Sequence, residues 1–199
     1  TCTGAGELYT RDFRSFMASL MEKMYNDRVV FKNRMNELKQ EQEDTGKDLS
    51  ADIAKADNMQ MAKKIQLNSA YGALGNEFFR WFDIRYAESI TLSGQLSIRW
   101  MEKHINEYLN KTLDTNEVDY VIACDTDSMY ITLDRLVEKT FENKEAKRDD
   151  ILRWMDLVAG KVFEPFIDKT FTKLAKHVNA YEQKMFMKRE AIADKGIWT

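Results

Sequence analysis

The chain has 199 residues, of which 44% are hydrophobic and 32% are charged, and its net charge at pH 7 is −3. These values are typical of soluble globular proteins and exclude the disordered and membrane classes. No apolar run approaches the roughly 20 residues of a membrane span, and the first residues given show no signal-peptide pattern. Because the first residue is Thr1, not Met, and Thr199 follows a strand-like stretch, we expect a piece of a longer protein with one or two domains.

The cysteines and histidines exclude two further classes of protein. Cys2 and Cys124 are the only cysteines, and they form no CxxC motif. This excludes a disulfide framework and indicates a reducing compartment. The only histidines, His104 and His177, lie far apart in the sequence, which disfavours a His-rich zinc site.

The first half of the chain predicts two long helices. The stretch GELYTRD, residues 6–12, predicts a short strand, and apolar residues at helical spacing then predict a helix from about Ser15 to Gln42. The polar cluster EDTGKDLS, residues 43–50, ends this helix, and we expect Ser50 to cap a second helix that runs to about Ala73. Two long helices joined by a short tip form an antiparallel hairpin.

The second half predicts a smaller, mixed structure, so the fold class is α+β. After a turn at GNEFFRW, residues 75–81, a third helix fits residues 83–111. The runs VIAC and MYITL predict a β-hairpin over 118–133. A helix from about Asp149 towards His177 contains Pro165, which should break or kink it. The stretch AYEQKMFMKREAIA, residues 180–193, predicts a closing strand.

Two carboxylates, Asp125 and Asp127, stand at the turn of this predicted β-hairpin. Paired carboxylates repel each other and are costly to desolvate unless a positive group neutralises them. A calcium loop is excluded because Tyr130 stands where the EF-hand pattern requires Gly, and Leu136 where it requires Glu. Two interpretations remain: a plain turn, where Asp is favoured, or a site for Mg²⁺ or Mn²⁺ that also binds a phosphate oxygen.

The second predicted helix carries a polar face of unusual composition. Lys64, Asn68 and Tyr71 share one face at helical spacing, and the small or apolar residues Met59, Ala62, Ala70 and Ala73 fall on the opposite face. On the first helix, Arg28 and Lys32 are spaced i, i+4 and share a face. A solvated helix face is the plain explanation for the charges between Arg11 and Lys39. If both faces turn to the same side, the cluster suits phosphate oxygens, with a ring beside it for stacking.

Together these motifs resemble a known family. The pattern K-x-x-x-N-S-x-Y-G from Lys64 to Gly72, followed about fifty residues later by D-T-D-S at 125–128, resembles motifs B and C of the family B DNA polymerases. The stretches FDIRYAESIT and INEYLNK are most similar to the T-even-type tailed-phage branch of that family, and the similarity covers nearly the whole chain. The resemblance implies a palm strand segment at 1–15, a fingers hairpin at 16–72 and a partial palm at 73–199.

The resemblance also implies roles for palm residues. Asp127 matches a direct metal ligand, and Asp125 matches the second carboxylate beside it, as ligand or support. Glu190, in MKREAI, matches a palm carboxylate near the metals. The implied cofactor is Mg²⁺, for which Mn²⁺ can substitute, and the implied chemistry is two-metal phosphoryl transfer.

In the fingers, the resemblance makes Lys64 a contact to the phosphates of the incoming nucleotide, with Asn68 and Tyr71 facing the nascent base pair. The stretch YNDRVVFKNRM matches the family's fingers segment, so Arg28 and Lys32 would hold the outer phosphates. The implied partners are primer-template DNA, dNTPs and, in a full-length parent, a sliding clamp and other replication proteins, with no membrane. The implied location is the cytoplasm of an infected host cell.

The chain also departs from the family's pattern. The family's motif A, an Asp followed shortly by S-L-Y-P, is absent from the 199 residues, and so is the Lys-Lys-Arg-Tyr segment. No exonuclease carboxylate motif, thumb or amino-terminal domain is present. We therefore expect these 199 residues alone to be inactive and to bind Mg²⁺ or Mn²⁺ only weakly, because a principal metal ligand is missing.

Two hypotheses from different classes follow from the sequence. The first is a segment of a template-directed DNA polymerase. The second is a non-catalytic nucleic-acid-binding or assembly module, in which the Asp pair is merely a turn. The co-occurrence of the Lys64, Asn68 and Tyr71 face with the Asp-x-Asp hairpin favours the enzyme, because a binding module has no need of both.

Overall fold

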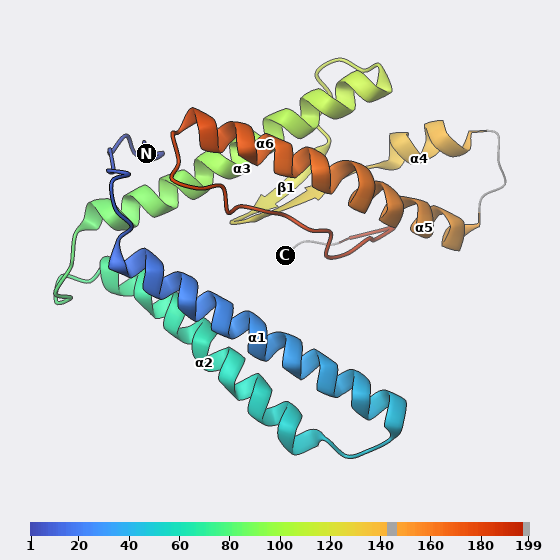
Figure 1. Cartoon of the computed structure of the whole chain (residues 1–199). Coiled ribbons are helices and arrows are strands. Elements are labelled where there is room, and N and C mark those ends of the chain that lie inside the picture. The colour runs from blue at the N-terminus through green and yellow to red at the C-terminus, as the bar shows by residue number, and fades with distance from the viewer. Residues whose placement is uncertain (143–146, 197–199) are drawn as a thin grey trace. The chain divides into compact units, whose positions relative to one another are not determined.

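The computed structural model describes residues 1–142 and 147–196, and the chain divides into two compact units. Unit 2 comprises Thr10–Glu88, and unit 1 comprises Thr1–Tyr9 and Ser89–Thr199. In chain order the elements of Figure 1 are α1 (Phe16–Thr45), α2 (Ser50–Leu74), α3 (Ile84–Leu113), β1 (Val121–Asp125), β2 (Ser128–Ile131), α4 (Asp134–Phe141), α5 (Arg148–Val158), the π-helical turn η1 (Ala159–Phe163) and α6 (Glu164–His177). The predicted α+β class is confirmed.

Helices α1 and α2 form the antiparallel helical hairpin of unit 2 (Figure 1). The Ser15 hydroxyl caps α1 by accepting a hydrogen bond from the Ala18 N–H at 3.2 Å. At the other end, Gly46 adopts φ +68°, and its N–H donates to the Gln42 carbonyl at 2.9 Å. A left-handed residue in this position is how a helix commonly ends, and glycine adopts it without strain.

The cap predicted at Ser50 is wrong, because Leu49 is the residue before α2 and its side chain makes no capping hydrogen bond. Ser50 is itself the first residue of α2, and its N–H donates to the Asp48 carboxylate at 3.0 Å. Hydrogen bonds from the Ser50 side chain and backbone lower the pKa of Asp48. The Gln42 side chain also accepts from the Leu49 N–H at 2.9 Å. Side chains of the tip, Asp48 and Gln42, therefore take the bonding role that was expected of Ser50.

The seam between α1 and α2 is thin. Leu38, Ala56 and Gln60 are its buried residues, and the Lys63 ammonium of α2 pairs with the Asp27 carboxylate of α1 at 3.2 Å. The buried and half-buried positions of α2 are Ile53, Ala56, Gln60, Lys63, Leu67, Ala70, Ala73 and Leu74.

The predicted packing face of α2 is therefore wrong in part. Ala70 and Ala73 are half-buried as expected, but Met59 is 42% exposed and Ala62 is also exposed. The small residues of this helix form no strong apolar stripe, so the periodicity predicts the helix but not its rotation.

Unit 1 has a packed core to which α3 and α6, which cross each other in Figure 1, both contribute. Helix α3 contributes Met101, Ile105 and Leu109, each 0% exposed, and α6 contributes Ile167, Phe171 and Leu174. Tyr120 and Val121, at the start of the β-hairpin, join the same cluster. The spacing of these residues gives each helix one apolar face, and burying both faces against each other stabilises unit 1.

Pro165 changes the helix type without ending the helix. Between α5 and α6 the chain makes the π-helical turn η1, in which the Glu164 N–H donates to the Ala159 carbonyl five residues back. Proline has no N–H, and its ring clashes with the carbonyl four residues earlier in an α-helix. A π-turn directly before Pro165 shifts the hydrogen-bond register, so the chain continues as α6.

Two predicted elements need correction, and one observed helix was not predicted. Residues 6–12 form no strand; only an isolated bridge joins Cys2 and Leu8. Residues 180–193 are also irregular, because within the described residues they find no strand to pair with. Helix α4 was missed because its eight residues fall short of the length, about 10–12 residues, at which a sequence pattern distinguishes a helix from a strand. None of the helices in the described ranges is both long and apolar enough to span a membrane.

Candidate active site

The two carboxylates lie at the tip of an antiparallel β-hairpin, as predicted. Asp125 is the last residue of β1 and pairs with Ser128, the first of β2, so the loop is Thr126 and Asp127 alone. Both Asp125 and Asp127 are exposed. The carboxylates are therefore accessible to a ligand.

Thr126, between the two carboxylates, has a strained backbone. Its φ is +48°, in the left-handed region that a β-branched residue rarely adopts. Its hydroxyl donates to the Asp125 carboxylate at 3.0 Å, and the Ser128 hydroxyl donates to the Asp125 carbonyl at 3.2 Å. Such strain persists where the surroundings hold it and is often found at functional sites. Here the two hydroxyls restrict the movement of Asp125.

Two asparagines of α3 hold the segment that leads into the β-hairpin. The Asn106 side chain accepts from the Tyr120 N–H at 2.8 Å and donates to the Asp119 carboxylate at 2.8 Å. One turn later, the Asn110 side chain accepts from the Val118 N–H at 3.0 Å and donates to its carbonyl at 2.8 Å. Sequence analysis missed this pair. Asparagines spaced i, i+4 inside a helix were the available signal, because Asn is a poor helix former.

The base of the β-hairpin rests on the core of unit 1. Tyr120 is 2% exposed, and its hydroxyl lies 2.8 Å from the Thr115 hydroxyl. Met129 and Ile131 of β2 pack on the same cluster. A two-stranded hairpin alone is marginally stable, so this packing and the asparagine bonds are what fix the position of its tip.

Cys124 lies next to Asp125 on β1. Partial burial, followed by the charges of Glu102 and Asp119, raises the pKa of its thiol. The thiol therefore stays protonated at neutral pH and is a poor ligand for a hard cation, which prefers oxygen. The donor set at the turn is consequently made of carboxylate oxygens.

This donor set fits a magnesium ion that is completed by a substrate. Mg²⁺ is usually held by one or two carboxylates together with substrate phosphates. No three His, Cys, Asp or Glu side chains in the described ranges stand close enough to hold a metal. Glu190 is exposed in the irregular segment after α6, and it does not join Asp125 and Asp127 in such a group.

In unit 2, the polar side chains predicted on one face of α2 are accessible. Lys64, Asn68 and Tyr71 are exposed, Tyr71 by 46%. The Asp27–Lys63 ion pair fixes the register across the seam, and in this antiparallel pair the segment of α1 that follows Asp27 lies level with the residues of α2 that precede Lys63 and Lys64. This segment carries Arg28 and Lys32.

Arg28 differs from its cationic neighbours because it is half-buried in the seam. Its Nε atom is buried and has no hydrogen-bond partner among the described residues, whereas Lys32 is exposed. The Asp27–Lys63 pair occupies one side of the seam. On a helical wheel centred on the buried positions of each helix, Arg28, Lys32 and Lys64 fall on the side of the seam opposite to this ion pair. Three cationic side chains with one unmatched donor suit an anion with several oxygens.

Comparison with known families bears on the two hypotheses that the sequence left open. The family model described as DNA polymerase family B matches residues 1–147. The chain belongs to DNA polymerase family B. The match includes Lys64, Asn68 and Tyr71 of α2 and Asp125 and Asp127 of the β-hairpin. Family membership therefore favours the enzyme over the binding module.

Individual relatives agree with this family. The chain is 42% identical over 138 residues to the "DNA-directed DNA polymerase" of Enterobacteria phage T4, which covers 69% of this chain and 15% of that protein. It is 40% identical over 134 residues to the protein of the same name in Escherichia phage RB69, or 67% of this chain and again 15% of that protein. "DNA polymerase 1" of Pyrococcus abyssi (strain GE5 / Orsay) is 30% identical over 142 residues, 71% of this chain and 16% of that protein. The chain thus spans about 15% of the length of these phage relatives.

Proposed function

We propose that this chain is a segment of a template-directed DNA polymerase that transfers nucleotides from dNTPs to a primer 3′-hydroxyl by two-metal phosphoryl transfer. The observation that carries the proposal is the accessible pair Asp125 and Asp127, on a two-residue turn whose base is fixed to a packed core. Positioning and electrostatic stabilisation supply most of the rate in phosphoryl transfer, so a rigidly held carboxylate pair suits this reaction.

Within this function, Asp127 is the direct metal ligand, and Asp125 is a second ligand or a support. Bound Mg²⁺, with Mn²⁺ as a substitute, supplies activation of the attacking hydroxyl and stabilises charge on the transferring phosphorus. Asp127 has the freer carboxylate, because the hydroxyl of Thr126 bonds the carboxylate of Asp125. The carboxylates of the β-hairpin turn contribute anionic oxygen ligands to the metal, and the nucleotide phosphates contribute further oxygen ligands.

The helical hairpin of unit 2 binds the nucleotide in this proposal. Arg28 and Lys32 hold the outer phosphates, and Lys64 contacts the triphosphate from α2. The unmatched Nε of Arg28 supports this role, because a buried donor without a partner is costly until an acceptor arrives. Asn68 and Tyr71, exposed one and two turns after Lys64, face the nascent base pair.

The 16–72 hairpin then corresponds to the fingers, residues 1–15 to a palm segment and 73–199 to part of the palm. The ligand that the family's motif A supplies would come from outside these residues. We therefore expect the 199-residue chain alone to be inactive with Mg²⁺ or Mn²⁺. The partners of the full-length protein would be primer-template DNA, dNTPs, a sliding clamp and other replication proteins, in an infected host cell.

The test is Asp127→Asn in the full-length polymerase that contains this segment. Loss of several kcal/mol of charge stabilisation should lower the incorporation rate by on the order of 10³-fold or more. Primer-template affinity should change little, because it comes mostly from phosphate contacts elsewhere. Single-turnover primer extension and DNA binding measure the two effects.

Asp114→Asn is the matched control. Asp114 is exposed and has φ +56°, a conformation that Asn adopts readily, so the same change there should leave the rate unaltered. An Asp127→Asn enzyme that extends primers at near wild-type rate would remove Asp127 from the metal site. It would also favour the alternative interpretation, in which Asp125 and Asp127 are only residues of a plain turn.

A further inference from the structure

Strand β1 contains a β-bulge between its base and the carboxylates at its tip. Val121 pairs with Ile131 of β2. Two residues later, Ala123 pairs with Tyr130, only one residue back along β2, so Ile122 is an extra residue in the ladder. A bulge bends its strand, increases the local twist and turns the following side chains in a new direction. The place of the bulge in β1 therefore influences where the carboxylates at the tip point.

The two backbone N–H groups directly before the bulge are bonded to one pair of side chains. The Tyr120 N–H donates to Asn106 Oδ1 at 2.8 Å, and the Val121 N–H donates to Asp119 Oδ1 at 3.1 Å. The side-chain amide of Asn106 also donates to Asp119 Oδ1 at 2.8 Å. A slip of β1 by one residue reverses the side to which each of its groups points, so it would break these bonds. The Asn106–Asp119 pair therefore specifies the register of β1 where the bulge begins.

Apolar packing alone does not specify this register. Met129 and Ile131 of β2 pack on the core of unit 1, but the burial of apolar surface has no preferred direction. The bulged residue, Ile122, is 53% exposed, so its own packing does little to hold it in place. Hydrogen bonds are directional, and those of Asn106 and Asp119 reach the residue next to the bulge.

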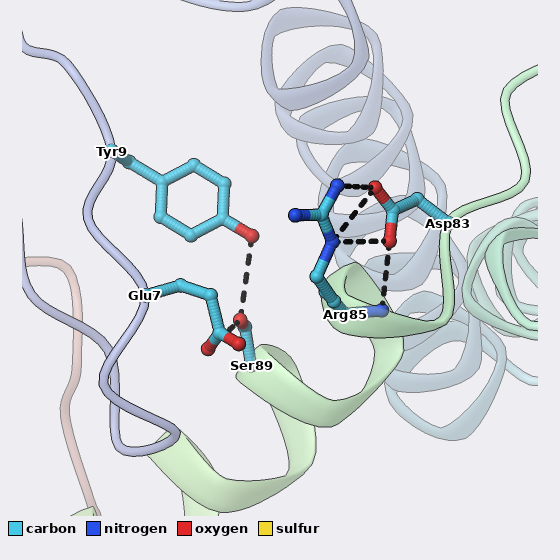
Figure 2. A network of polar contacts seen from close by, with 5 residues as sticks. All are labelled: Glu7, Tyr9, Asp83, Arg85 and Ser89. Atoms are coloured by element: carbon cyan, nitrogen blue, oxygen red, sulfur yellow. Dashed lines mark hydrogen bonds and ion pairs between the residues drawn. The ribbon is translucent and has the colours of Figure 1, made fainter.

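Helix α3, which carries Asn106, is held in place within unit 1. The three residues that it contributes to the core are each 0% exposed. Nearer the start of the helix, the Ser89 hydroxyl donates to the Glu7 carboxylate at 3.0 Å and accepts from the Tyr9 hydroxyl at 3.3 Å (Figure 2). Ser89 is 4% exposed, so these bonds are shielded from water. A side chain of α3 that bonds the β-hairpin therefore extends from a fixed helix.

Small movements at the Asn106–Asp119 pair become larger at the tip of the β-hairpin. Tyr120 stands five residues before Asp125, which is about 17 Å along an extended chain. A tilt of about 5° at Tyr120 would therefore move the Asp125 backbone by roughly 1.5 Å. A misplacement of about 1 Å can lower a rate by roughly 10²-fold, because reacting groups must be held within about 0.5 Å of their productive positions.

We propose that Asn106 and Asp119 act as positioning residues, which pin the β-bulge of β1 against α3 and thereby set the direction of the Asp125 and Asp127 carboxylates. This inference rests on the proposed polymerase function, to which it adds the residues that orient the metal ligands. The effect of the pair passes through the backbone of the β-hairpin. It should therefore appear in the incorporation rate and in the Mg²⁺ concentration that the reaction needs, and little in the affinity for primer-template.

The test exchanges the two side chains in the full-length polymerase that contains this segment. Asn106→Asp removes the donor between the two positions and sets two carboxylates against each other, so the single-turnover rate at saturating dNTP should fall on the order of tenfold or more. Adding Asp119→Asn places an amide at position 119, which can donate to the carboxylate at position 106, and both backbone N–H groups keep an acceptor. The double variant should therefore recover a rate within about threefold of wild type.

The direction of the Mg²⁺ effect separates positioning from simple charge. Asn106→Asp adds a negative charge, which by itself would strengthen cation binding and lower the half-saturating Mg²⁺ concentration. A displaced carboxylate pair should instead raise that concentration. Asn106→Ser loses the bonds to Tyr120 and Asp119 without adding a charge, so it should act in the same direction, and it serves as the test if Asn106→Asp does not fold. Asn116→Asp adds the same charge at an exposed residue of the segment before β1, and this matched control should leave the rate unchanged.

The outcomes distinguish the inference from the proposed function. Asn106→Asp and Asn106→Ser enzymes with a lowered Tm but the rate and Mg²⁺ dependence of Asn116→Asp would overturn the inference and leave the polymerase function intact. A double variant no faster than Asn106→Asp alone would also overturn it, because the restored bonds would then have no effect. A wild-type protein that incorporates no nucleotide would overturn both.

Discussion

The two units fix their functional side chains in different ways. Unit 1 has a core in which Met101, Ile105 and Leu109 are 0% exposed, and its carboxylates stand on a β-hairpin packed against that core. In unit 2, the buried residues of the helical hairpin are Leu38, Ala56 and Gln60, all of them in its seam. The carboxylates of Asp125 and Asp127 are thus carried by a β-hairpin packed on a large core, whereas the cationic side chains are carried by a helical hairpin with few buried residues.

This difference matches what each group must do in the proposed reaction. Carboxylates that bind metal must be held within a narrow range of positions, since the reacting oxygens are aligned on them. Side chains that bind a triphosphate need reach and charge, and the nucleotide itself can order them. The packed core of unit 1 therefore suits carboxylates that must move little, and the thin seam of unit 2 suits cationic side chains that can move more.

The largest expected difference between the units is in stability. Phe171 of α6 is 2% exposed in the core of unit 1, so Phe171→Ala should lower the free energy of unfolding by about 3–5 kcal/mol. Leu38 is 4% exposed, but most of its neighbours in the seam are half-buried and can close the space. Leu38→Ala should therefore cost only about 2 kcal/mol, near the low end for such changes.

Hydrogen exchange in the full-length protein would separate the two effects. Phe171→Ala should speed exchange in α3 and α6, and Leu38→Ala should speed it in α1 and α2 alone, because each unit opens as its own cooperative part. Leu157, 50% exposed on α5, is the matched leucine for Leu38, and its change to Ala should alter the stability by about 0.5 kcal/mol or less. A Leu38→Ala protein as destabilised as Phe171→Ala would end the distinction between the units.

A smaller difference concerns nucleotide binding. Lys64→Ala should raise the KM for dNTPs or lower kcat by about 10–100-fold without changing the Tm, because an exposed lysine on a thin helix supports binding and not the fold. Lys55, exposed on the same helix but about half a turn round from Lys64, is the matched control. Steady-state kinetics that are the same for Lys64→Ala and Lys55→Ala would exclude Lys64 from the nucleotide site.

Sequence predicted the long elements well because their signals are repeated. Helix α1, Phe16–Thr45, was expected from about Ser15 to Gln42, and its two ends carry recognisable caps. The β-hairpin was expected because two apolar runs flank a polar turn, and the position of Asp125 and Asp127 at this turn followed from the same pattern. These features depend on neighbours in sequence, which is why a single sequence reveals them.

The features that sequence missed depend on residues far apart. Residues 180–193 alternate like a strand, yet a strand needs a partner, and no pattern within the segment reports one. The rotation of α2 was wrong in part because its small residues give no strong apolar stripe. The bonds of Asn106 to Tyr120, or of Ser89 to Glu7, join positions that only the fold brings together.

The smallest expected effect concerns how the two units shift the pKa of an acid. At the tip of unit 2, local hydrogen bonds from Ser50 lower the pKa of Asp48. On β1 of unit 1, partial burial is the largest cause of the raised pKa of Cys124, and the negative charges of Glu102 and Asp119 raise it further. Because a raised pKa keeps the thiol protonated, alkylation of Cys124 by iodoacetamide should begin at a higher pH than for a free thiol.

Glu102→Gln tests the electrostatic part of this shift. Removing one negative charge should move the pH profile of Cys124 alkylation part of the way back and raise the rate by roughly twofold at a fixed pH below its midpoint. Glu107→Gln, on the same helix but paired with Lys103 on the surface, is the matched control and should leave the rate unchanged. Equal rates in both variants would mean that burial alone sets the pKa of Cys124. A rate change of about tenfold or more in Glu102→Gln would instead make charge the dominant cause of the raised pKa of Cys124. The pKa shifts of Asp48 and Cys124 would then both arise from individual neighbouring groups and not from burial.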